Sequence, residues 1–379
     1  MKKFRTVIFW AHLAAGLIAG VVIFIMSVTG ALLSFERQMI EASEREARTV
    51  AVPANAGTLP PSQILGSFIA SRPGAEPATL TILNEPDAAW QLSLGRGEIA
   101  FVDPYTGSVT GGENRTVRDL MSGLRSWHRW LAMSGDTRPI GKAITGASNL
   151  LFLFLAISGI YIWFPRNLSW RSAKNVLWFK RGLTGRARNF NWHNTIGFWT
   201  SLLLIIFTLT ATVISYRWAS DLLYTLTGNT PPASGRPGGG DSEKAPYALP
   251  ENLDLLVERA AGHTPEWRSI ALRLPISKDE ASFTIDEGIY WNIFGRSSLT
   301  LDAATGDVKN WEPYGEQNAG RQLRTWFRFT HTGETGGIPG QVLGLIACVG
   351  GAFLVWTGFS LAFRRFGRWL RGRRQDDLV

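Results

Sequence analysis

Four of the five histidines lie in or beside long apolar runs, where an ionisable side chain is costly and usually has a function. They are His12, His128, His193 and His331. A neutral imidazole is the usual axial ligand of a b-type haem, and two imidazoles at equal depth on different helices can hold one haem. The histidines therefore predict two haem b groups per chain, one between His12 and His193 and one between His128 and His331.

The depth of each histidine determines these pairs. His12 follows Arg5, and His193 follows Arg188, by about one to two helical turns at ~1.5 Å per residue. The first pair is therefore expected just inside one membrane boundary. Both histidines of the second pair precede an apolar run, which places them at the opposite boundary.

Glycines and arginines next to these histidines would surround the haems. Gly16 and Gly197 each follow a histidine of the first pair by one helical turn, on the same helical face. A missing side chain there would let a flat macrocycle approach the backbone, although helix packing through small residues explains the same glycines equally well. Four arginines with i, i+4 spacing flank the second pair: Arg125, Arg129, Arg324 and Arg328. They are expected either to bind haem propionates or to lie at the lipid headgroups.

Two other metal chemistries fit the chain less well. A zinc site would require nearby cysteines or a His-x-x-x-His spacing, which these histidines lack. The only cysteine, Cys348, lies in an apolar run, so a cysteine-ligated iron–sulfur cluster and an internal disulfide are excluded. His263 follows a segment of soluble composition and is expected at the surface.

Four apolar runs, about 7–33, 140–164, 193–216 and 338–363, are long enough to cross a bilayer as helices. The first is too long for a signal peptide and has no small-residue cleavage site, so we expect it to remain as a span. The net charge is +9, and lysine and arginine cluster before the first run, between the second and third, and after the fourth. Basic residues favour the cytoplasmic side, so both termini are expected in the cytoplasm. Topology explains the positive charge, and no nucleic-acid partner is expected.

The chain also contains an internal repeat. The histidine of Trp-Ala-His near the start and the glycine four residues after it recur near the middle, where Asn-Trp-His is followed by a glycine at the same spacing. A D-x-x-T-G-x-V motif also occurs twice, at Asp103–Val109 and at Asp302–Val308. Each half would contain a span, an outer domain and a second span, as a parallel repeat. On this alignment Phe327 corresponds to His128, so the second histidine pair departs from the repeat by about one helical turn.

The predicted fold is an integral membrane α-helical protein with four transmembrane helices, an internal duplication and two small periplasmic α+β domains. The predicted parts are a first span (1–35), an outer domain (36–125), a histidine segment with the second span (126–165), a basic cytoplasmic loop (166–190), a third span (191–217), a second outer domain (218–325) with a Gly/Pro-rich loop (228–250), a histidine segment with the fourth span (326–363) and a basic tail (364–379). Alternating apolar residues predict strands at 79–83, 90–94, 99–102, 269–274, 281–285 and 298–301.

These features resemble the PepSY-associated transmembrane family. The resemblance rests on the paired spans, the D-x-x-T-G-x-V motifs, the histidine in the first span, His-Arg-Trp-Leu before the second span and His-Thr-Gly before the fourth, and it covers nearly the whole chain. It implies a multi-pass protein of the bacterial inner membrane. Likeness to members of the FoxB type implies a haem-containing ferrisiderophore reductase, an oxidoreductase that reduces a ferric siderophore and releases Fe(II) for uptake.

Two histidine ligands leave haem iron no open position, which favours electron transfer, and we predict no catalytic side chain. The segments expected in the cytoplasm contain no G-x-G-x-x-G motif, so electrons must come from a separate cytoplasmic donor or from quinol. Three other functions stay open: a quinone-linked cytochrome b, a haem or siderophore permeation protein, and a non-redox PepSY sensor or peptidase inhibitor.

Overall fold

The computed structural model describes residues 2–54, 57–95, 97–111, 115–164, 177–232, 249–288 and 294–376. Residues 166–176 of the predicted basic loop and residues 233–248 of the Gly/Pro-rich loop lie outside this set. The chain divides into two compact units. The helical unit contains Met1–Glu36, Leu120–Leu223 and Trp326–Val379, and the sheet unit contains Arg37–Asp119 and Tyr224–Thr325.

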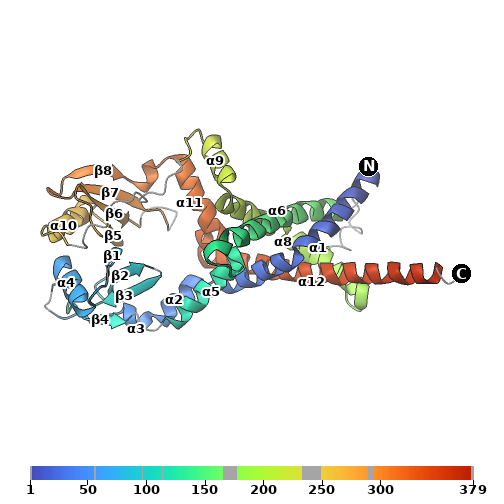
Figure 1. The fold of residues 1–379 in the computed structure, drawn as a ribbon, viewed down its shortest axis with the longest axis horizontal. Helices are drawn as coiled ribbons and strands as arrows, with labels where there is room; N and C mark the ends of the chain where they lie inside the picture. Colours follow the sequence, from blue (N-terminus) through green and yellow to red (C-terminus); the bar gives the residue numbers. More distant parts are fainter. Residues whose placement is uncertain are drawn as a thin grey trace. The chain divides into compact units, whose positions relative to one another are not determined.

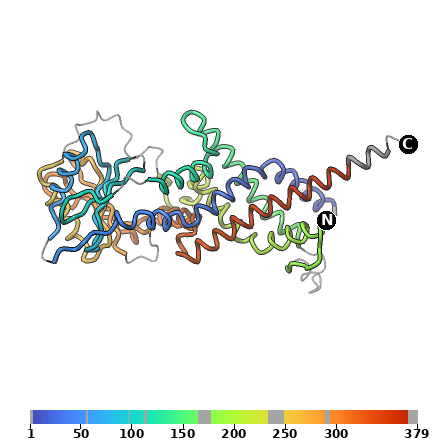
Figure 2. The backbone as a smooth tube through the Cα atoms, turned by 90° about the horizontal axis from the view of Figure 1, so that it is seen from below, coloured from blue at the N-terminus to red at the C-terminus, as the bar shows by residue number. Residues whose placement is uncertain are grey.

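Four long helices form the body of the helical unit (Figure 1). They are α1 (Lys2–Leu33), α6 (Arg138–Trp163), α8 (Gly185–Ser215) and α12 (Gly337–Asp376). All four are long and apolar enough to cross a membrane, so the four predicted spans form helices of the required length and composition. Helices α1 and α8 each pack against both α6 and α12 (Figure 2), so all four helices line a common interior.

Two shorter helices lead into α6 and α12. Helix α5 (Thr116–Trp130) precedes α6 through the 3₁₀ turn η1 (Gly135–Thr137), and α11 (Ala319–His331) precedes α12 through η3 (Glu334–Gly336). A Cβ atom at Gly141 would overlap the carbonyl oxygen of Trp130, and one at Gly340 would overlap that of Gly333. Since only glycine permits this approach, the C-terminal ends of α5 and α11 are held against α6 and α12.

The remaining helices are short. Helices α2 (Glu36–Ser43) and α3 (Arg45–Arg48) follow α1, and α9 (Arg217–Leu226) follows α8. The 3₁₀ turn η2 (Tyr314–Glu316) precedes α11. A buried carboxylate, Glu44, accepts hydrogen bonds from Arg48 and Arg118 and so ties the start of α3 to α5 inside the sheet unit.

The sheet unit contains one antiparallel sheet of eight strands, in the order β4-β3-β2-β1-β5-β6-β7-β8. Its strands are β1 (Thr79–Leu83), β2 (Trp90–Gly95), β3 (Glu98–Val102), β4 (Val109–Gly111), β5 (Ser269–Arg273), β6 (Glu280–Asp286), β7 (Ser297–Asp302) and β8 (Val308–Glu312). The six predicted strands are present, and β4 and β8 are additional. Strand β1 pairs with β5, with Leu80 opposite Leu272, so the two predicted strand sets form a single sheet.

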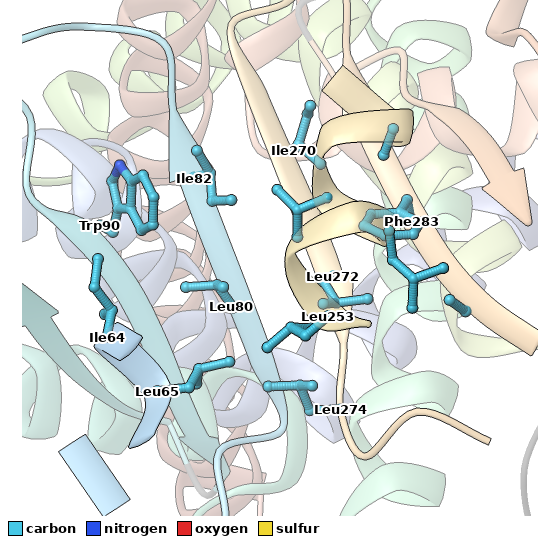
Figure 3. Close-up of a cluster of buried hydrophobic side chains, with 14 of the residues drawn as sticks. Ile64, Leu65, Leu80, Ile82, Trp90, Leu253, Ile270, Leu272, Leu274 and Phe283 are labelled. Atoms are coloured by element: carbon cyan, nitrogen blue, oxygen red, sulfur yellow. The ribbon is translucent and has the colours of Figure 1, made fainter. Parts of the chain in front are cut away.

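One hydrophobic core underlies this sheet (Figure 3). Alternate side chains of the strands, such as Leu80 and Leu272, pack with apolar residues of α4 (Pro61–Ser71) and α10 (Leu253–His263). The two helices also contact each other. Burial of these side chains is the main force that joins the strand sets, at roughly 25 cal/mol for each Å² of apolar surface removed from water.

Candidate functional site

His12 on α1 and His193 on α8 line one cavity of about 350 Å³ inside the helical unit. All four long helices contribute to its walls, and most of the lining side chains are apolar. Gly16 and Gly197, predicted from the sequence to lie beside a ligand, both line this cavity. Arg186 and Arg365, which the sequence did not single out, line it as well.

Both histidines of the cavity are held by a buried hydroxyl group. His12 Nδ1 lies 2.8 Å from Ser158 Oγ, and His193 Nδ1 lies 2.9 Å from Thr357 Oγ1. The Thr357 hydroxyl donates its own proton to the carbonyl oxygen of Phe353 at 2.7 Å, so it accepts the proton of His193 Nδ1. This assigns the proton to Nδ1 and leaves the lone pair of Nε2 available to a metal.

His128 on α5 and His331 on α11 form the second site. His128 Nδ1 lies 2.9 Å from the carbonyl oxygen of Met26, and His331 Nδ1 lies 3.0 Å from that of Phe207. A carbonyl oxygen only accepts, so both Nδ1 atoms must carry a proton and both Nε2 atoms have a free lone pair. Thr29 and Thr210 hydroxyls lie 3.1 and 3.3 Å from the same Nδ1 atoms.

The two rings of the second site are spaced as two ligands of one metal would be. Their centres are 6.3 Å apart and their planes are inclined by 48°. A metal–imidazole bond is about 2 Å long and a ring nitrogen lies about 1.1 Å from the ring centre, so rings on opposite sides of one metal have centres about 6 Å apart. The donor set and spacing therefore fit a bis-histidine haem.

Burial keeps both rings of this site neutral near pH 7. It lowers the pKa of His128 to about 4, and the charges of His331 and Arg129 act in the same direction. Burial also lowers the pKa of His331. The neutral imidazole is the form that binds a metal.

The two histidines of the second site make matching hydrogen bonds, although the alignment on the D-x-x-T-G-x-V motifs does not pair them. Met26 and Thr29 correspond to Phe207 and Thr210 at the same offset that relates His12 to His193. His128 and His331 contact these corresponding residues, so His331, and not Phe327, occupies the position of His128. The chain between His331 and Gly340 is about one helical turn shorter than that between His128 and Gly141, which accounts for the offset between the two histidines in the sequence alignment.

Two glycines that the sequence did not single out lie closest to the rings of the cavity. A Cβ atom at Gly159 would lie 3.6 Å from His12 Cε1, and one at Gly358 would lie 3.6 Å from His193 Cε1. Each directly follows the hydroxyl residue that binds the histidine. A Cβ atom at Gly16 or Gly197, in contrast, would meet only a leucine side chain, at 3.9 and 3.4 Å. Close approach of two helix backbones therefore does not explain why these two positions are glycine.

The four predicted arginines differ in their surroundings. Arg125 forms an ion pair with Glu36, and Arg324 and Arg328 are exposed on α11. Arg129 follows His128 and keeps much of its side chain exposed. Partial burial lowers the pKa of Arg129 most, and the positive charges of Arg138, Arg328 and Arg125 lower it further. Three arginine charges therefore lie near Arg129.

Other parts of the chain offer less for metal binding. Among the described residues there is no group of three or more histidine, cysteine, aspartate or glutamate side chains that could hold a metal ion. A structural zinc site uses four such ligands. His263 packs edge-on against the ring of Trp311 in the sheet unit, with ring centres 4.6 Å apart.

A family model described as the PepSY-associated TM region matches residues 9–365, which include both histidine pairs and the whole sheet. No curated protein matches the chain.

Proposed function

Because the chain belongs to the PepSY-associated transmembrane family, we propose that it carries electrons across a membrane on two b-type haems and reduces a ferric siderophore. One observation carries this proposal: four histidines occupy two sites, and each has its Nδ1 hydrogen-bonded within the helical unit. Fixed Nδ1 atoms orient the rings and leave the Nε2 atoms to bind iron. The matching contacts of His128 with α1 and of His331 with α8 also support an origin of the helical unit by internal duplication.

A haem between two histidines supplies one-electron transfer and leaves no coordination position for a substrate. The side chains of the chain position the two groups and exclude water from the space around them. One hydrophobic cluster touches both sites, since Phe152 lines the cavity and the Phe207 ring lies 6.1 Å from that of His331. A packed apolar path of this kind supports electron exchange between the sites. Reduction of one Fe(III) to Fe(II) consumes one electron, which a cytoplasmic or quinol donor must replace.

The direction of transfer depends on the orientation in the membrane. We propose a bacterial inner-membrane protein with both termini in the cytoplasm, which places the His128–His331 site and the sheet unit on the periplasmic side. A phosphatase reporter inserted at Gly239, in the loop outside the described residues, is expected to be active, and one fused after Val379 is expected to be inactive. The reverse pattern would contradict both the orientation and the proposed direction of electron flow.

The reaction itself is tested with purified protein under anaerobic conditions. After reduction with dithionite and removal of the excess, addition of a ferric siderophore is expected to reoxidise the haems, with one Fe(II) captured by a ferrous chelator per electron lost. Haems that remain reduced with a broad panel of ferric chelates but are reoxidised by quinone would refute ferric reduction. That result would favour a quinone-linked cytochrome b.

A further inference from the structure

The turn after α5 has an unusual backbone. Leu131 and Ala132 are consecutive residues with φ angles of 54° and 58°, a conformation that side chains other than glycine rarely adopt. Hydrogen bonds hold the turn, since the Leu131 amide donates to Trp127 and the Thr145 hydroxyl donates to the Arg129 carbonyl at 2.8 Å. Strain maintained in this way is concentrated at functional sites.

This turn brings two guanidinium groups to one indole ring. The Cζ atom of Arg129 lies 4.6 Å from the centre of the Trp130 ring, and the Cζ atom of Arg138 lies 3.8 Å from it. Both arginines are exposed at the surface. The ring attracts each cation, but two cations at one ring repel each other unless an anion lies between or beside them.

The neighbouring charges do not neutralise this pair. Arg328 adds a third positive charge near Arg129, whereas Arg125 is already paired with Glu36. Within the part of the chain that the structure describes, no carboxylate forms an ion pair with Arg129, Arg138 or Arg328. Asp136, the only acid in the turn, is exposed and also forms none of these pairs.

We infer that Arg129 and Arg138, which face the Trp130 ring, and the neighbouring Arg328 form a binding site for a ligand that carries several carboxylates. Guanidinium groups bind carboxylates in a planar, bidentate manner, and the indole holds two of them in position before the ligand arrives. Only the identity of the ligand rests on the proposed function. The carboxylates belong either to an anionic ferric chelate that receives electrons at this end of the protein, or to a haem held by the adjacent His128.

The first measurement uses gallium(III)–EDTA, an anionic chelate whose metal does not undergo reduction under these conditions. Its affinity for the purified full chain is measured by equilibrium dialysis. If the ligand is a chelate, the double variant Arg129→Gln/Arg138→Gln is expected to bind about tenfold more weakly, as loss of two exposed charge pairs implies. Arg217→Gln is the matched control, because Arg217 is an exposed arginine of the same unit that pairs with Asp221. Salt at 0.5 M should weaken binding by wild type much more than by the double variant.

The second measurement distinguishes the two sources of the carboxylates. Haem content and midpoint potential are compared in wild type and the double variant. Weaker chelate binding with unchanged haem assigns the arginines to a substrate, and lost haem or a shifted potential with unchanged chelate binding assigns them to haem carboxylates. Either result supports the site. If neither property changes, the inference is wrong and the arginines contact only lipid headgroups. Gallium binding does not depend on electron transfer, so failure of ferric reduction in wild type would leave this test intact.

Discussion

Replacing His193 with alanine is expected to lower the haem bound per chain from about two to about one. His193 and His12 both line the cavity of the helical unit, and the single ligand His12 would not hold a low-spin haem there. The His128–His331 site should keep its haem, because its rings are held by separate hydrogen bonds to α1 and α8. Haem is counted per chain by the pyridine haemochrome assay, and the remaining low-spin signal is recorded by EPR.

Two further variants show whether the loss is specific. Thr357→Val removes the hydroxyl that binds His193 Nδ1 but keeps the side-chain volume, so haem affinity is expected to fall by roughly 10–100-fold while the fold persists. His263→Ala should keep both haems, since that ring packs on Trp311 in the sheet unit. Two haems in His193→Ala, or a lost haem in His263→Ala, would refute the proposed ligand assignment.

Periodicity in the sequence was sufficient to predict most of the fold. Four long apolar runs gave the four helices that can cross a membrane, and alternating apolar residues gave six of the eight strands. The prediction missed β4 and β8 because Val109–Gly111 is very short and Val308–Glu312 is mostly polar. The predicted family is confirmed by the match over residues 9–365.

Contacts between distant segments were harder to predict. The pairing of β1 with β5 depends on a shared core, and nothing local in either strand specifies it. The matching contacts of His128 and His331 with α1 and α8 are visible only in the structure. The nearby segments Leu124–Arg129 and Leu323–Arg328 share a Leu-Arg-x-Trp-x-Arg pattern, which aligns His128 with Phe327 instead. Arg138 lay beyond a turn, so sequence spacing did not place it next to Trp130.

The glycines of the cavity illustrate the same limit. Gly16 and Gly197 were found from their spacing to a histidine on the same helix. Gly159 and Gly358 lie on other helices, and a contact between helices is needed to recognise them. A signal was nevertheless present, since a hydroxyl residue followed by glycine occurs at matching positions of the second and fourth spans, as Ser158-Gly159 and Thr357-Gly358.

Gly358 gives the sharpest test of where the first haem binds. Gly358→Leu is expected to abolish haem binding at the His12–His193 site, because the added side chain would extend from a point 3.6 Å from His193 Cε1 into the cavity of about 350 Å³. Gly358→Ala adds only an atom at ordinary contact distance and should keep most of the haem. The count per chain should therefore fall from about two to about one only for the larger side chain.

The control must separate a filled cavity from a damaged helix. Val349→Leu enlarges a side chain on the same helix α12 that is 42% exposed at the surface of the helical unit, and it should keep both haems. The His128–His331 haem should keep its spectrum in all three variants, which reports an intact helical unit. A Gly358→Leu protein that folds and still binds two haems would show that this cavity does not hold the cofactor. His12 and His193 would then be hydrogen-bonded structural residues, and a transmembrane path with one haem near each face would have to be abandoned.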